Sequence, residues 1–309
     1  MSLLHEIKLK GAAVHAERIS APLFQDLLHI FVEGAQRALR FRIEGRSTAR
    51  GGVPAWLRSA AQFDLLLESE SEAGVFKVES RPLKQVLPEH LRSSEALADV
   101  GAEGSAVDLF EAGLEDALAG VADSDRFDEG LVETFSAFAR LFDQGVEGIE
   151  VINGHAFPID VEGVERVARL RRQTPPPRAI RIAGKLDAIR HSDRFFTLIL
   201  ESGAALRGVW ERLDSDRVTA SFGQKVIVSG VAVFRPSGSV LRIEAEHIEP
   251  ASSRQATLWS VLPRPLFTPM DPRALRQSQD ERSGLSAIFG QWPGEETEDE
   301  FSAALRELS

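Results

Sequence analysis

The stretch from Arg178 to Pro250 constrains the fold of this 309-residue chain more than any other part of it. Short segments rich in Val, Ile, Leu and Phe follow one another there, separated by Gly, Ser, Asp and Pro. A stretch between the third and fourth segments, residues 213–222, has room for one or two helical turns. Consecutive strand signals with one short helical insert predict an all-β unit. The five segments are residues 178–190, 195–201, 206–212, 225–234 and 240–248.

Two glycines inside these segments indicate that the strands close into a barrel. Gly184 lies in the first segment and Gly230 in the fourth, where a barrel strand has to bend or bulge. The fourth segment, KVIVSGVAVF, is a nearly continuous apolar run, as expected for a strand with little solvent contact. This strand order and glycine placement resemble the OB-fold, a five-stranded Greek-key barrel that often binds oligonucleotides. The expected unit is therefore an OB-like barrel over residues 178–250.

Residues 1–172 predict a separate α+β domain. Ser20 is a good helix N-cap with Pro22 in the first turn, and apolar residues follow at helical spacing through residue 42. The outer face of this helix carries Arg37, Arg40 and Arg42, which indicate a solvated basic edge or an anion contact. Residues 173–177 contain three consecutive prolines and predict a linker to the barrel. Further helices are expected at 107–118, 130–142 and 161–171, and strands at 4–14, 63–68, 75–79 and 148–152.

Composition points to a protein of the cytoplasm. The chain contains no cysteine, which excludes disulfides and Cys-based metal sites and suits a reducing compartment. It contains no apolar run near the roughly 20 residues of a membrane helix, and its first residues lack the apolar core of a signal peptide. We therefore expect a cytoplasmic location and no membrane association.

No catalytic motif is recognisable in the sequence. The seven histidines are scattered, and HExxH, GxSxG and strand-associated GxGxxG patterns are absent. Asp123, Asp125 and Asp128 form an acidic group that indicates either a helix N-terminus or a cation site, although the loop glycine of a calcium-binding EF-hand is missing. The expectation is a protein that is not an enzyme and uses neither a cofactor nor a metal.

The aromatic residues of the barrel offer a nucleic-acid site. Phe195 and Phe196 are adjacent, so in a regular strand one of them faces outward. Bases stack on outward aromatic rings beside Arg or Lys in proteins that bind single strands, with core packing of these rings as the alternative. The net charge of the chain is −11, but residues 178–250 hold eleven Arg or Lys against nine Asp or Glu. The candidate nucleic-acid-binding residues are Phe195, Arg207, Trp210 and Arg212.

The end of the chain has the pattern of a segment that binds a protein partner. Residues 251–283 are polar and proline-containing and predict an extended linker, whereas residues 284–309 contain large apolar side chains that need a surface to bury them. Thr297 with Glu300 forms a capping box, and an apolar stripe follows it. This pattern predicts a short amphipathic helix that enters a groove on a partner, or that packs on its own domain.

The segment Ile288-Phe289-Gly290-x-Trp292-Pro293-Gly294 resembles the C-terminal tails of antitoxins that neutralise PIN-domain (VapBC-type) ribonuclease toxins. Those tails wrap along the toxin near its metal-dependent active site. The resemblance implies an antitoxin-like protein that inhibits a PIN-type ribonuclease through its tail. The alternative is an OB-fold protein that binds single-stranded nucleic acid and recruits a protein with the tail. The candidate partner-binding residues are Ile288, Phe289, Gly290, Trp292, Gly294, Phe301, Leu305, Leu308 and the two arginines Arg282 and Arg306.

Overall fold

A computed structural model describes residues 3–11, 14–15, 18–66, 74–88, 104–190, 194–210 and 213–266. The candidate partner-binding residues, from Arg282 to Leu308, lie outside the described residues, and so does Arg212. The predicted tail helix and most of the predicted linker therefore stay predictions.

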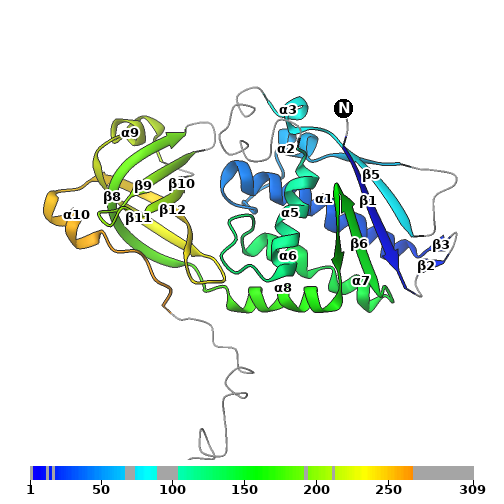
Figure 1. Ribbon diagram of the computed structural model, residues 1–309. Helices are drawn as coiled ribbons and strands as arrows, with labels where there is room; N and C mark the ends of the chain where they lie inside the picture. Colours follow the sequence, from blue (N-terminus) through cyan, green and yellow to red (C-terminus); the bar gives the residue numbers. More distant parts are fainter. Residues whose placement is uncertain are drawn as a thin grey trace, which may run out of the picture. The chain divides into compact units, whose positions relative to one another are not determined.

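The first part of the chain builds an antiparallel sheet whose helices gather on one face (Figure 1). Its strand order is β4-β5-β1-β6-β7. The central strand β1 alternates, because His5, Ile7 and Leu9 are buried while Leu4 is 53% exposed on the opposite face. The strands are β1 (Leu3–Lys10), β4 (Phe63–Leu66), β5 (Val75–Ser80), β6 (Gly148–Asn153) and β7 (His155–Ile159), beside a small β2 (Val14–His15) and β3 (Arg18–Ile19) ribbon.

The helix expected over residues 20–42 is confirmed as α1 (Ala21–Glu44). The side chain of Ser20 accepts a hydrogen bond from the Leu23 amide, and the helix ends at Gly45, which has a left-handed φ of 71°. Glycine adopts that conformation without the strain a Cβ would add. The other helices are α2 (Ala55–Ala60), α3 (Leu83–Val86), α5 (Ala106–Ala119), α6 (Glu129–Ser136), α7 (Ala139–Asp143) and α8 (Val161–Gln173).

The single helix expected over residues 130–142 is wrong in detail, because it is divided into α6 and α7. The amide of Ala137 bonds the carbonyl of Thr134, and the amide of Phe138 bonds that of Phe135. Such three-residue spacing tightens the backbone and ends the α-helical ladder. Its apolar stripe is nevertheless core, as expected: Phe135 and Phe138 are fully buried.

The second part of the chain is a closed five-stranded barrel with the strand order β10-β12-β11-β8-β9. Neighbouring strands are antiparallel except β10 and β12, which run parallel from the Gly208–Ile243 pair to the Trp210–Ala245 pair. The expected α+β region followed by a five-stranded barrel is thus confirmed. The strands are β8 (Arg178–Arg190), β9 (Phe195–Ile199), β10 (Ala205–Trp210), β11 (Lys225–Phe234) and β12 (Val240–Pro250), with α9 (Ser215–Ala220) between β10 and β11.

The two barrel glycines play different parts. At Gly230 the register of β11 against β12 shifts, and a Cβ there would collide with the carbonyl oxygen of Glu244. The expected bend is therefore present at this position. At Gly184 a Cβ would lie 2.7 Å from the carbonyl oxygen of Ile199, while the register shift of β8 falls later, between Leu186 and Ala188. Gly184 thus permits a close approach of β9 to β8, but the irregularity in β8 does not lie at this glycine.

The chain leaves the barrel through a capped helix, α10 (Ser253–Trp259), so the start of the expected extended linker is helical. Ala256 of this helix packs against Ala183 and Ile227 on the outside of the barrel. In the part of the chain that the structure describes, no helix is both long enough and apolar enough to cross a membrane.

Candidate nucleic-acid interface

The outer face of β8, β9 and β10 carries two of the side chains that were selected from the sequence, Phe195 on β9 and Arg207 on β10. Along β9, Phe196 and Leu198 are fully buried in the barrel, whereas Phe195 and Thr197, which alternate with them, point to the other face. The expectation that one of the two adjacent phenylalanines faces outward is met by Phe195, which is half-buried. This places one aromatic ring on the outside of the second barrel strand.

Strand register brings basic residues beside this ring. Arg190 of β8 is paired with Phe195, and its guanidinium lies 4.6 Å from the centre of the Phe195 ring. Arg207 of β10 is paired with Thr197, two residues further along β9 than Phe195 and therefore on the same face. The side chain of Arg207 is 59% exposed and lies 3.8 Å from the carboxylate of Asp125. We name the set Arg190, Phe195, Thr197 and Arg207 the outer barrel face.

Trp210 does not belong to this face. Its side chain is only 3% exposed, and its ring lies in the barrel core with a centroid distance of 6.1 Å to Phe196. The reason is strand parity: Trp210 is three positions after Arg207, so the two side chains point to opposite faces of β10. Trp210 therefore offers no stacking surface in this conformation.

The outer barrel face is bounded by residues of the α+β region. Gly45, at the end of α1, approaches Val209 so closely that a Cβ on it would lie 2.9 Å from a Val209 methyl. The turn between β11 and β12 is also covered, because the Ser237 amide donates to the Ala122 carbonyl at 3.1 Å. Arg235 in the same turn donates to the Ser124 carbonyl at 3.2 Å. These contacts bound the outer barrel face at Val209 and at the turn between β11 and β12.

The acidic group found in the sequence contacts the barrel through each of its members. Asp128 caps α6 by accepting from the Leu131 amide, and it also accepts from Arg242 at 3.2 Å. Asp123 accepts from the hydroxyls of Ser239 and Ser237, and these bonds lower the pKa of its carboxyl below the ordinary value. Asp125 faces Arg207, as described above. The helix N-terminus interpretation is correct for Asp128. Asp123 instead forms hydrogen bonds with Ser237 and Ser239 of the barrel, and Asp125 lies near Arg207.

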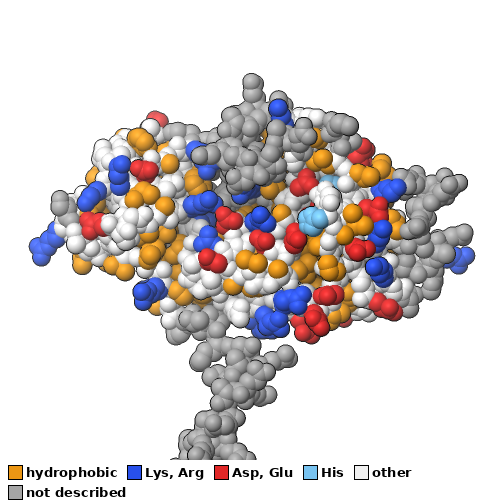
Figure 2. All heavy atoms as spheres, in the orientation of Figure 1, with side chains coloured by type: hydrophobic (Ala, Val, Ile, Leu, Met, Phe, Trp, Pro, Cys, Tyr) orange, Lys and Arg blue, Asp and Glu red, His pale blue; other side chains and the backbone are white. Residues whose placement is uncertain are grey.

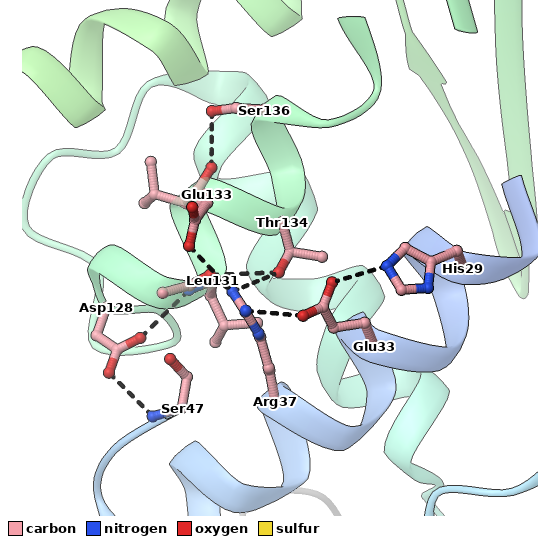
Figure 3. A network of polar contacts seen from close by, with 11 residues as sticks. His29, Glu33, Arg37, Ser47, Asp128, Leu131, Glu133, Thr134 and Ser136 are labelled. Atoms are coloured by element: carbon pink, nitrogen blue, oxygen red, sulfur yellow. Dashed lines mark hydrogen bonds and ion pairs between the residues drawn. The ribbon is translucent and has the colours of Figure 1, made fainter. Parts of the chain in front are cut away.

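The arginines of α1 are engaged within the α+β region rather than forming a free basic edge. Arg37 donates to the carbonyl of Gly130 at 2.6 Å and to the hydroxyl of Thr134 at 3.1 Å, and it pairs with Glu33 at 2.7 Å (Figure 3). The side chain of Arg40 is only 9% exposed and lies 3.6 Å from the carboxylate of Glu44. The Arg37 contacts join α1 to α6, whereas the Arg40 contact lies within α1. Both leave these arginines poorly placed for an external anion.

A groove of about 1260 Å³ lies beside the barrel, along β12. Its apolar lining includes Val209, Leu213 and Ile248, and its charged lining includes Arg50 and Glu246. Because basic and acidic side chains both line it, the groove lacks the single sign of charge that would attract a polyanion. We therefore assign the nucleic-acid candidate to the outer barrel face and not to this groove.

One cluster in the described part of the chain has the composition of a cation site. His5, Asp108 and Glu111 each offer a ligand atom, and these atoms lie within 4.8 Å of one another. This cluster was not predicted from the sequence, because His5 on β1 is separated from the two carboxylates on α5 by about a hundred residues. The available signal was the spacing of Asp108 and Glu111, which puts both on one face of a helix.

Comparisons of the chain with models of known protein families, with curated protein sequences and with solved structures give no match.

Proposed function

We propose that the barrel binds single-stranded nucleic acid on the outer barrel face. In support, the first strand is followed around the barrel by the second, third, fifth and fourth, and a helix lies between the third and fourth strands. This arrangement resembles the OB-fold. OB-folds bind oligonucleotides on the second and third strands, which are β9 and β10 here. The observation that carries the proposal is the outward ring of Phe195 between Arg190 and Arg207.

The chemistry of the face suits bases in an extended strand. Every base has a π face, so stacking on Phe195 tolerates any sequence and contributes about 1–3 kcal/mol per base. Arg190 already lies over the ring and can stack on a base or pair with a phosphate. Arg207 supplies a second cation two positions along the β9–β10 pair. Recognition of this kind favours single strands over duplexes, whose bases are already stacked.

Charge limits how tightly such a face can bind. The chain has a net charge of −11, and Lys and Arg are interspersed with Asp and Glu over the surface that Figure 2 presents. Long-range attraction of a polyanion is therefore weak, and binding has to come from a few short-range contacts. We expect measurable affinity at low salt and a steep loss as the salt concentration rises.

The test is a titration of fluorescein-labelled single-stranded DNA and RNA oligonucleotides by fluorescence anisotropy at low salt. We expect Phe195→Ala to weaken binding by about 1–3 kcal/mol, since it removes the stacking ring. Phe222→Ala is the matched control, because Phe222 is 58% exposed but lies outside the outer barrel face. Equal affinities of the two variants, or no binding by the unaltered protein at micromolar concentration, would refute the proposal.

The tail supports a second candidate function, inhibition of a PIN-type ribonuclease. The supporting observation is the sequence of residues 288–300, which combines large apolar side chains, glycines and an acidic run with the capping pattern of a predicted helix. In such an antitoxin-like protein Ile288, Phe289 and Trp292 are the anchors, because a few buried aromatic and aliphatic side chains dominate interface energy. This function is compatible with a nucleic-acid-binding barrel in the same chain.

The tail function is tested by co-expressing the protein with a PIN-domain ribonuclease encoded next to it. We expect the full chain to bind the ribonuclease and restore growth, and a chain without residues 284–309 to do neither. A Phe289→Ala, Trp292→Ala double variant should behave as the truncated chain. Full protection by the truncated chain would remove the antitoxin-like function without affecting the nucleic-acid proposal.

A further inference from the structure

A polar cluster is enclosed between α5 and the sheet, away from the outer barrel face. Nδ1 of His5, on β1, lies 3.0 Å from both carboxylate oxygens of Glu111 on α5. Nε2 of His5 lies 2.8 Å from the hydroxyl of Ser80 on β5. Asn153 of β6 donates its side-chain amide to Glu111 at 2.8 Å and also to Asp108. Four elements therefore converge on one small site.

Burial makes the charge of this cluster costly. The exposed fraction of His5 is 0% and that of Glu111 is 3%, while Asp108 is half-buried. Among the described residues, no Arg or Lys forms an ion pair with Asp108 or Glu111. Glu111 pairs with the imidazole, whereas Asp108 is held by hydrogen bonds from Ser105 and Asn153 without a cationic partner among the described residues. Buried charge of this kind is stabilised by pairing or by coordination of a metal.

The orientation of His5 suits a metal ligand. If Nε2 carries the proton and donates it to Ser80, the lone pair of Nδ1 points at the Glu111 carboxylate, which is itself an acceptor. In the other tautomer Nδ1 carries the proton and donates it to Glu111, so a bound metal ion would take the place of that proton. A histidine that donates its second N–H to a protein oxygen is the usual arrangement around a bound metal. Asp108 is held in turn by the Ser105 amide at 2.6 Å.

We propose that His5, Asp108 and Glu111 bind one first-row divalent transition-metal ion, with Zn²⁺ as the representative. One imidazole with two carboxylates favours such an ion over Ca²⁺, which requires six to eight oxygen ligands. Ser80 and Asn153 orient the ligands without needing to coordinate the metal. The half-buried Asp108 and Asn153 mark the side from which the ion enters.

The test is isothermal titration calorimetry of the full chain with Zn²⁺ after dialysis against a chelator, with Mg²⁺ titrated in parallel. We expect one Zn²⁺ per chain, at least tenfold weaker binding of Mg²⁺, and a rise in Tm on Zn²⁺ addition. Glu111→Gln should weaken Zn²⁺ binding at least tenfold and abolish the rise in Tm. The isosteric amide still fills the space and can donate to the lone pair of His5 Nδ1, or accept from Nδ1 in the other tautomer.

Glu115→Gln is the matched control, because Glu115 lies one turn further along α5 and accepts from the exposed His155 at 3.2 Å. Adventitious binding to a surface histidine and carboxylate should be lost in this variant and kept in Glu111→Gln. That pattern, or the absence of stoichiometric Zn²⁺ binding, would overturn the proposal. If Glu111→Gln does not fold, Asp108→Asn replaces it and the same comparison decides.

Discussion

Two aspartates of the α+β region, Asp128 and Asp125, each approach an arginine of the barrel. Asp128 is nearly buried and receives hydrogen bonds from the amides of Ser47 and Leu131 and from Arg242, whose side chain is 10% exposed. Asp125 is half-exposed and makes only the 3.8 Å approach to Arg207. The two aspartates are close in sequence but differ in desolvation, so their substitutions should have different consequences.

We predict that Asp128→Ala lowers the free energy of unfolding by about 2–3 kcal/mol, because it removes the cap of α6 and one of the two carboxylates that pair with the nearly buried Arg242. Glu244, at 2.8 Å, remains as the other partner of Arg242. Asp125→Ala should change stability by less than about 1 kcal/mol. Urea denaturation followed by circular dichroism measures both. Similar losses for the two variants would show that the buried ion pair does not stabilise this junction.

At the scale of elements, the barrel is the part of the fold that sequence reasoning predicted best. Its segments are bounded by Gly, Ser, Asp and Pro, and β11 (Lys225–Phe234) has the predicted bounds. β7 (His155–Ile159) was not predicted, because a proline such as Pro158 usually interrupts a strand, although an edge strand tolerates it.

Local sequence patterns also could not predict the hydrogen bonds of Asp123 with Ser237 and Ser239, since those contacts span more than a hundred residues.

The candidate site was predicted only in part, for a related reason. Strand alternation correctly indicated that one of Phe195 and Phe196 faces outward, and only the burial of Phe196 decides which. Trp210 was chosen because Arg207 and Arg212 are near it in the sequence. That criterion ignores the alternation of side chains along β10, which points Trp210 to the face opposite Arg207. Arg190 was not chosen, because its place over Phe195 depends on the register of β8 against β9.

The bulge in β11 provides a prediction at this scale. Gly230→Ala should destabilise the chain by about 1–3 kcal/mol or more, because the new Cβ meets the backbone of β12 and a strand must shift. Gly148→Ala is the matched control, since nothing lies within 4 Å of a Cβ at that strand position. Thermal unfolding should show a lower Tm for the first variant alone. Equal Tm values would mean that β12 relaxes without cost.

At the scale of the whole molecule, a polyanionic chain presents a small basic and aromatic face. Residues 178–250 carry a slight excess of Arg and Lys in a chain whose net charge is −11. Nucleic-acid binding should therefore be local and salt-sensitive. We predict that Arg207→Ala weakens binding similarly for all sequences and reduces the slope of log affinity against log salt by about 0.7, the loss of one phosphate contact.

The most direct test is ultraviolet cross-linking of a single-stranded oligonucleotide to the full chain at low salt, with the cross-linked peptides identified by mass spectrometry. We predict cross-links in residues 185–207, centred on Phe195, that disappear in Phe195→Ala and persist in Phe222→Ala. Cross-links confined to the first 173 residues, or none above the level given by duplex DNA, would contradict the assignment of the outer barrel face.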